Sequence, residues 1–254
     1  HFDLGMSFQT GRPVLDDILY FFPATFELAS IAMIIAIVFG IPLGVISAVK
    51  RNSFLDQAAR VISLIGVSMP VFWLGLVLLL IFYFKLSWLP EPGRLDIMLI
   101  EPPRITGMLL IDSIIAGDWE VFQDALMPSI MPATVLGLFG LAGIVRIAIF
   151  SMLDVLSQEY VKTARIKGLS EFWVIVRHAF PNALVPTVTM IGLTYGGLLE
   201  GAVLTETIFS WPGLGRYLTV AFLTLDLNAI VGGTMLVAIS YSLVNLLVDL
   251  LYAY

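Results

Sequence analysis

The sequence predicts an all-α membrane protein, a polytopic bundle of helices that each cross the bilayer. Hydrophobic residues make up 59% of the 254 residues and charged residues only 13%, which leaves too little polar surface for a water-soluble domain of this length. The charges are also clustered, so long uncharged runs lie between them. Because hydrocarbon offers the backbone no hydrogen-bond partners, such runs are expected to be helices rather than open strands. Composition therefore predicts a lipid environment, and charge spacing predicts helices within it.

The uncharged runs predict five transmembrane helices. Each run reaches the length of about 20 residues that a helix needs to cross the hydrocarbon core. The preceding segment, residues 1–23, is expected to be external or interfacial, and Pro13 with Asp16 and Asp17 suits the start of an interfacial helix there. All five runs fall in one transmembrane domain, residues 24–254, and they are residues 28–49, 61–84, 125–145, 179–199 and 227–248.

The loop charges predict the orientation, because short loops rich in Lys and Arg stay in the cytoplasm. The loop at residues 85–127 carries three basic and seven acidic residues, so we expect it outside, where it could receive a soluble binding protein. Residue 1 then lies outside and residue 254 inside. The two ends therefore lie on opposite sides, and the number of spans is odd. We expect a further span before His1 that starts in the cytoplasm and brings residue 1 to the outside, for a total of six. Two loops are expected in the cytoplasm. The first holds Lys50, Arg51 and Arg60, and the second, residues 154–182, holds Lys162, Arg165, Lys167 and Arg177.

The residues that usually carry catalysis or bind metals are scarce. The chain has no cysteine and two histidines, His1 and His178, neither with a second ligand at metal-binding spacing. A phosphate-binding loop, a nucleophile elbow and an HExxH zinc pair are all missing from the sequence. We therefore expect no enzymatic activity, no cofactor or metal in this chain, and no nucleic-acid partner.

The most informative segment is the basic loop EYVKTARIKGLSEFWVIVRHAFP, residues 159–181. Good helix formers end at Lys167, and Gly168 stands where a left-handed C-cap would lie. Ser170 then suits the N-cap of a second helix, which Pro181 either ends or follows as the foot of the next span. The spacing predicts a helix, a break and a helix that project from the membrane. The simpler alternative is a loop that only binds acidic lipid headgroups.

This loop resembles the EAA motif of binding-protein-dependent ABC importer permeases, which has a small-residue triplet, then a glycine, then a proline. The triplet departs from the Glu and Ala that name the motif, but it matches the dipeptide, oligopeptide and nickel branch, which typically has EYVRTARAKGL. Further resemblance lies in TGRPVLDDIL, PATFELA, GIPLGVISA and ETIFSWPGLGR, in order along the chain. The first two look more like the first permease subunit of such systems. The matching loop positions are Lys162, Thr163 and Ala164, then Gly168, then Pro181.

The resemblance implies a permease subunit of an ATP-driven importer for di- or oligopeptides or related solutes, in the inner or plasma membrane of a prokaryote. It implies a second homologous permease, two cytoplasmic ATP-binding subunits that carry ATP and Mg, and an extracytoplasmic substrate-binding protein. In such importers the EAA loop places a coupling helix in a cleft on the ATPase. The residues implied for this contact are Glu159, Tyr160, Lys162, Thr163, Ala164, Arg165, Lys167, Gly168, Leu169 and Pro181.

Two further features stand near the expected span ends. Arg146 is the deepest intramembrane charge, and it could pair with a carboxylate, face a hydrated path or extend to the interface. The segment ETIFSWPGLGR cannot continue a straight helix, so we expect a re-entrant or interfacial turn on the outer side. The resemblance favours an external gate there, and an ordinary interfacial Trp anchor is the alternative. The residues of this turn are Glu206, Trp211, Pro212, Gly213 and Gly215.

A second class of function is a secondary transporter that uses an ion gradient without an ATPase. Such proteins usually show broken helices in two repeated halves, and no internal repeat is visible here. A membrane scaffold would explain the helices and the basic loop, but not the ordered match along the chain. Association with an ATPase, lost when Gly168 is altered, would separate the importer from both alternatives.

Overall fold

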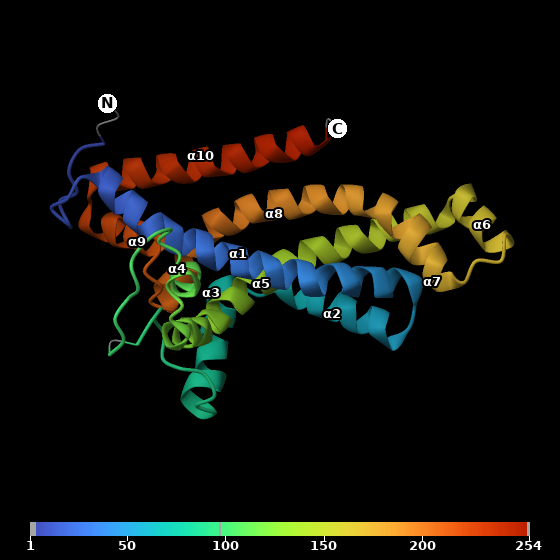
Figure 1. Ribbon diagram of the computed structural model, residues 1–254, viewed down its shortest axis with the longest axis horizontal. Coiled ribbons are helices and arrows are strands. Elements are labelled where there is room, and N and C mark those ends of the chain that lie inside the picture. The colour runs from blue at the N-terminus through green and yellow to red at the C-terminus, as the bar shows by residue number, and fades with distance from the viewer. Residues whose placement is uncertain (1–3, 97, 253–254) are drawn as a thin grey trace.

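The structure, a computed structural model, describes residues 4–96 and 98–252. Within these ranges the regular structure is helical, apart from an isolated bridge between Met6 and Pro13. This confirms the predicted all-α class. Four long helices extend along the longest axis of the molecule (Figure 1), and they are α1 (Val14–Val49), α5 (Trp119–Ser157), α8 (Phe180–Ile208) and α10 (Leu227–Tyr252).

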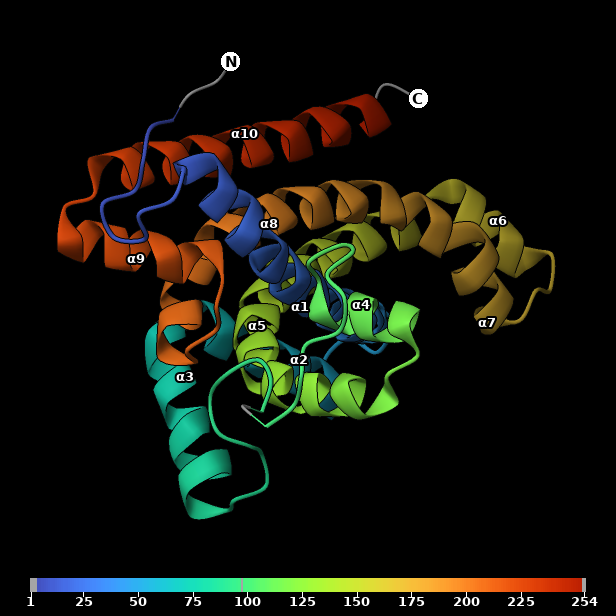
Figure 2. The ribbon, with the colours of Figure 1, turned by 60° about the vertical axis from the view of Figure 1, so that its left-hand side comes forward.

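Shorter helices connect the long ones and define two ends of the molecule. The amino-terminal end holds residues 4–13 and α9 (Leu214–Thr224), and the basic-loop end holds α6 (Glu159–Ile166) and α7 (Glu171–Trp173), as Figure 2 shows. The remaining elements are α2 (Phe54–Ser68), α3 (Val71–Leu78), the π-helical segments η1 (Leu79–Lys85) and η2 (Val174–Ala179), and α4 (Leu109–Ala116).

Within the described residues, four helices are long and apolar enough to cross a membrane, and a bent pair makes a fifth candidate. The prediction of one continuous helix over residues 61–84 is wrong in shape, because the chain bends there by 105°. The cause is Pro70, whose ring pushes the preceding residue out of the helical region. Met69 is accordingly extended (φ −87°, ψ 131°), and Pro70 begins the next helix as its N-cap. The second span is therefore broken between α2 and α3.

Close contact between α1 and α5 forms the centre of the bundle. A Cβ added at Gly44 of α1 would lie 2.5 Å from the Cβ of Ala148 on α5, so only glycine allows this approach. Leu28 of α1 and Leu136 and Ile144 of α5 are fully buried in the same apolar cluster. Small side chains at the contact let the two backbones approach, as is usual for helices packed in membranes.

Two helices begin earlier than the membrane-spanning runs. α1 starts at Val14 after Pro13, as the proline and acidic pair predict, and it continues through the expected interfacial segment into the membrane run. α5 starts at Trp119, because the Asp118 carboxylate accepts a hydrogen bond from the Val121 N–H at 3.1 Å. The expected loop at residues 85–127 therefore includes α4 and the first turns of α5.

Candidate functional site

The basic loop between α5 and α8 forms a helical hairpin at one end of the molecule (Figure 2). α6 ends in a turn at Gly168, whose φ is +83°. The Gly168 N–H donates to the Arg165 carbonyl oxygen at 2.9 Å. This confirms the predicted left-handed turn. A Cβ at Gly168 would meet no atom within 4 Å, so backbone conformation, and not lack of space, requires the glycine.

The second half of the loop differs from the expected separate helix. α7, η2 and α8 run on as one helix from Glu171 to Ile208, 38 residues long. Ser170 is at the N-cap position, but its side chain makes no capping hydrogen bond. Pro181 lies in the first turn of α8 and does not end a helix there. The wider π-helical turn of η2 stands directly before it, so the proline is the foot of the next span.

The inner face of the loop packs against the ends of three long helices. Val161 and Ala164 of α6 are buried in an apolar cluster with Met152 of α5, Ala48 of α1 and Val174 of η2. The spacing of the two α6 residues puts both on one helix face. α6 is therefore held by apolar packing to the helices that cross the bundle.

The outer face of the loop leaves large apolar side chains exposed. Ile166 is 86% exposed and Phe172 is 65% exposed. Tyr160, Leu169 and Trp173 are exposed as well. Contiguous exposed apolar groups with a polar rim are typical of protein or membrane contact sites.

The charges of the loop are partly paired within it. The Lys162 ammonium lies 2.7 Å from a Glu159 carboxylate oxygen, and the Arg165 guanidinium lies 2.7 Å from Glu171 across the turn. Thr163 donates to the Glu159 carbonyl oxygen at 2.9 Å. Among the described residues, Lys167 has no ion-pair partner. Exposed pairs of this kind are weak, so Lys162 and Arg165 remain available to a partner.

At the amino-terminal end, Glu206 is a buried carboxylate that closes the start of α9. It accepts hydrogen bonds from the Thr25 hydroxyl at 2.6 Å and from the Arg216 N–H at 3.0 Å. The Thr25 hydroxyl oxygen in turn accepts from the Leu214 N–H at 2.8 Å. A Cβ at Gly213 would overlap the Glu206 carboxylate. Glu206 thus acts as a helix cap that joins α1, α8 and α9.

The rest of this turn is also packed against the bundle. Trp211 is only 1% exposed, and its indole N–H donates to the Ala24 carbonyl oxygen at 2.9 Å. The alternative of an interfacial Trp anchor is therefore wrong, because the ring does not reach the surface. Gly215 lies so close to Val203 that a Cβ would approach the Val203 Cα to 2.6 Å. Pro212 lines a small pocket together with Arg94. The predicted gate remains a prediction.

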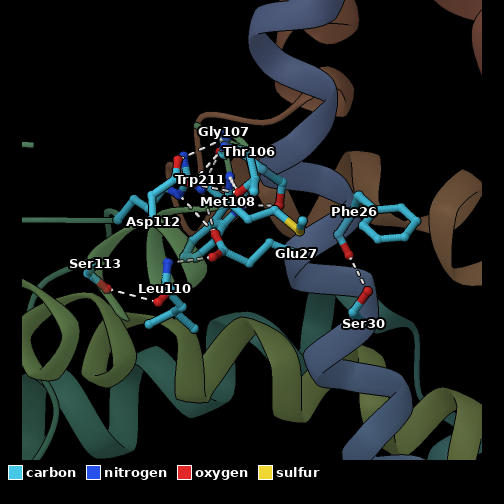
Figure 3. A network of polar contacts seen from close by, with 12 residues as sticks. Phe26, Glu27, Ser30, Thr106, Gly107, Met108, Leu110, Asp112, Ser113 and Trp211 are labelled. Atoms are coloured by element: carbon cyan, nitrogen blue, oxygen red, sulfur yellow. Dashed lines mark hydrogen bonds and ion pairs between the residues drawn. The ribbon is translucent and has the colours of Figure 1, made fainter. Parts of the chain in front are cut away.

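A polar network next to this turn was not predicted from the sequence. Glu27 of α1 is 4% exposed and lies 2.5 Å from the Arg94 guanidinium, and it also accepts from the Leu110 N–H at 2.7 Å. Figure 3 shows Glu27 beside Leu110 and Trp211. The Arg94 guanidinium lies 5.6 Å from the centre of the Trp211 ring. Charge scarcity makes Glu27 conspicuous in the sequence, but its partner lies 67 positions away.

The loop that carries Arg94 is itself ordered by Asp112 of α4. The Asp112 carboxylate accepts hydrogen bonds from the Thr106 N–H at 2.7 Å and from the Gly107 N–H at 2.9 Å. Burial acts to raise the pKa of Asp112, but these hydrogen bonds outweigh it and the pKa lies below its ordinary value. Gly107 also receives a hydrogen bond from Arg94 on its carbonyl oxygen, at 3.0 Å. The outer loop is therefore fastened to α1 through Glu27.

Arg146 is exposed on the side of α5 and has no carboxylate partner among the described residues. The option of an ion pair is therefore not realised there. Its side chain lines a cleft between α2 and α5, together with Arg51 and Arg60. The cleft has a volume of about 520 Å³. A hydrated path and an interfacial position both remain compatible with this placement.

Comparisons with known proteins agree with this arrangement. Residues 40–254 match the family model described as binding-protein-dependent transport system inner membrane component. The chain is 47% identical to the probable D,D-dipeptide transport system permease protein of Escherichia coli, over 99% of this chain and 74% of that protein. It is 48% identical to the dipeptide transport system permease protein of the same organism, over 99% and 75%. A putrescine export system permease protein of Escherichia coli is 38% identical, over 100% and 79%.

The family model covers most of the chain, and it includes the last turns of α1, the basic loop and the Glu206 turn. The helical bundle provides the membrane spans that such a protein needs. The chain belongs to the family of binding-protein-dependent transport system inner membrane components and is a multi-pass protein of the bacterial inner membrane.

Proposed function

We propose that this chain is a permease subunit of an ATP-driven, binding-protein-dependent importer, and that α6, the Gly168 turn and α7 form its contact with an ATP-binding subunit. The observation that carries the proposal is the exposed apolar tip around Ile166 and Phe172. Such a tip in water is unfavourable unless a partner covers it. The cationic groups at Lys162 and Lys167 border the tip and suit an acidic rim on that partner.

The loop is attached so that force on its tip reaches the membrane helices. The helix from Glu171 to Ile208 is continuous, and 38 residues at 1.5 Å each give a lever about 57 Å long. α6 is joined to α5 and α1 by the cluster around Val161 and Ala164. Movement of an ATP-binding subunit would therefore shift α8 and α5 together and alternate the access of the solute path.

The partners follow from the family. We propose a second, homologous permease chain, two ATP-binding subunits on the cytoplasmic side and a substrate-binding protein outside. ATP and Mg belong to the ATP-binding subunits, because this sequence has no phosphate-binding loop. The positions of Lys and Arg support a cytoplasmic basic-loop end.

Dipeptides or short oligopeptides are the proposed solutes. Two relatives that are 47% and 48% identical to this chain over the aligned residues carry dipeptide transport in their names. A third, at 38% identity, is named for putrescine export, so family membership alone does not select a solute. The proposal therefore rests on the two more similar relatives.

The experiment is purification of this chain with whatever stays bound, in mild detergent, from its native membrane. Gly168→Asp should lose the ATP-binding subunits, because it places a side chain and a negative charge on the contact, while Asp tolerates the left-handed conformation better than most residues. Gly117→Asp is the matched control, since Gly117 is also left-handed (φ +71°), has nothing within 4 Å and ends α4 near the other end.

Loss of the ATP-binding subunits in Gly168→Asp alone would support the proposed contact. Equal retention in both variants, or equal loss in both, would refute the assignment of the contact to this loop. A wild-type chain that carries no ATP-binding subunit but transports along an ion gradient would instead establish the alternative of a secondary transporter.

A further inference from the structure

The cleft between α2 and α5 combines cationic groups with apolar walls. Arg51, Arg60 and Arg146 line it, and they come from the turn after α1, from α2 and from α5. The apolar lining includes Leu64, Phe150 and Leu153. Leu64 is 58% exposed and Phe150 is 64% exposed. One cleft therefore offers guanidinium groups and hydrocarbon surface together.

The positive charge of the cleft is only partly compensated. Arg60 donates to the Asp56 carboxylate at 2.8 Å, and that carboxylate also accepts from the Ser47 hydroxyl and from the Asn52 N–H. Arg51 and Arg146 have no hydrogen-bond or ion-pair partner within the described part of the chain. Two guanidinium groups are thus free to bind an anion.

Helix lengths place these arginines at the level of the lipid headgroups. Residues 125–145 of α5 separate Asp124 from Arg146, and these 21 residues span about 31 Å at 1.5 Å each. Residues 28–49 of α1 similarly separate Glu27 from Lys50, by about 33 Å. Both distances match a hydrocarbon core of about 30 Å. The acidic residues then mark one membrane surface, and the arginine cleft lies at the other, on the side of the basic loop.

We propose that this cleft binds the phosphodiester headgroup of an anionic phospholipid from the cytoplasmic leaflet. The planar guanidinium groups of Arg51 and Arg146 suit phosphate oxygens, to which each can donate two hydrogen bonds. The acyl chains lie along Leu64, which stands deeper in the membrane than Arg60 on α2, while Phe150 and Leu153 flank the headgroup on the cytoplasmic side. An arginine beside acyl chains without a counter-anion is costly, whereas basic pockets between cytoplasmic helix ends commonly hold anionic lipids.

The chemistry favours a lipid over the other possible occupants. Free phosphate would satisfy the arginines but leave the apolar walls exposed to water. A second permease chain would cover the walls but would need carboxylates opposite both arginines. An anionic lipid supplies both parts in one molecule and is present wherever the chain is inserted. It would also connect the α1–α2 hairpin to α5, a few residues before the basic loop begins.

The test is native mass spectrometry of the full chain, purified from its native membrane with the subunits that stay bound. Phosphatidylglycerol and phosphatidylcholine are added as competing lipids. The wild type should retain one phosphatidylglycerol per copy under activation that removes phosphatidylcholine. Arg51→Gln combined with Arg146→Gln should lower that occupancy at least about tenfold, because two charge-assisted contacts are lost. Arg51→Gln alone should lower the phosphatidylglycerol occupancy severalfold. Because Arg51 lies outside the spans, this single variant tests the proposal if the double variant does not fold.

The matched control is Lys50→Gln, which removes an equal charge beside Arg51 but does not line the cleft. It should bind like the wild type. Equal loss in this control, or equal retention of both lipids by the wild type, would overturn the proposal. Displacement of phosphatidylglycerol by excess inorganic phosphate would reassign the site to the free anion. A photo-crosslinking residue at Leu64 should capture lipid, and capture of a second permease chain there would also overturn it.

Discussion

At the amino-terminal end, Glu27 and Glu206 are buried carboxylates that accept hydrogen bonds from distant segments of the chain. At the basic-loop end, Glu159 and Glu171 are exposed and pair with cations of their own loop. Buried polar groups without partners are costly, so the first end must satisfy its charges internally. The second end faces water and need not do so.

Apolar side chains show the same contrast between the two ends. Trp211 at the amino-terminal end is fully buried, with Arg94 over its ring. Ile166 and Phe172 at the basic-loop end are exposed. One end is therefore completed by contacts within the chain, and the other presents a surface that suits a partner. This contrast predicts that substitutions will affect folding at the first end and assembly at the second.

The largest expected effect is that of Glu27→Ala. It leaves the half-buried Arg94 guanidinium and Leu110 N–H without this acceptor, so we expect the free energy of unfolding to fall by about 3 kcal/mol. Thermal unfolding in detergent measures the loss. The double variant Glu27→Ala with Arg94→Ala should recover part of it, because the uncompensated charge is gone. Unchanged stability in the single variant would mean that this end is not fastened by Glu27.

Asp226, between α9 and α10, gives the next largest effect. Burial acts to raise the pKa of Asp226, but hydrogen bonds from the Ser7 hydroxyl and the Ala229 N–H outweigh it, so the pKa lies below 3.8. Asp226→Asn places an amide N–H₂ opposite these donors, and we expect a loss of about 2 kcal/mol at pH 7. Hydrogen exchange of residues 4–13 measures the release of the amino-terminal segment. Matched exchange in both proteins would contradict a role for Asp226.

The same carboxylate predicts a pH dependence. Its pKa is lower in the folded than in the unfolded state, so its contribution is present above pH 3.8 and is lost as pH falls through the folded pKa. The wild type should therefore lose stability below pH 3.8 more steeply than Asp226→Asn. Parallel unfolding curves for the two proteins over that range would rule out this contribution.

The sequence predicted features that depend on neighbours in the chain. The membrane runs follow from clustered charges, the start of α1 follows from Pro13, and the turn at Gly168 follows from glycine after a helical segment. The break at Pro70 was also visible, since a proline inside an apolar run favours an extended preceding residue. The length and hydropathy of residues 61–84 alone predict an unbroken span, and they do not register this proline.

Contacts between distant segments were not predictable in this way. Arg94 lies in an irregular loop, and nothing local indicates that it reaches Glu27, 67 positions away. The alternative of an interfacial anchor for Trp211 is wrong because the cover of its ring comes from α1 and from that same loop, which no neighbouring residue indicates. The sequence left open whether Pro181 ends the second helix or begins the next span, because a proline ends a helix in its interior but is tolerated in the first turn.

Gly168 is expected to give a smaller effect on folding and a clear effect on assembly. Its φ of +83° in open space predicts that Gly168→Ala costs about 1 kcal/mol in stability, while Gly168→Asn costs less because asparagine tolerates this conformation. Copurification of ATP-binding subunits should fall in the order Gly, Asn, Ala. If Asn and Ala reduce it equally, the contact excludes any side chain, and backbone conformation is not the main requirement.

The smallest expected effect on stability is that of Arg165→Ala. Arg165 pairs with Glu171 across the turn, but both side chains are exposed, so the pair should contribute about 0.5 kcal/mol. High salt should abolish that difference, because it screens exposed charges. The Glu27–Arg94 pair, buried between α1 and the outer loop, should keep its effect in the same salt. Arg165→Ala could instead lose as much stability as Glu27→Ala and keep that loss in high salt. This result would remove the distinction between the two ends, since it would show that the basic loop also depends on its charges to fold.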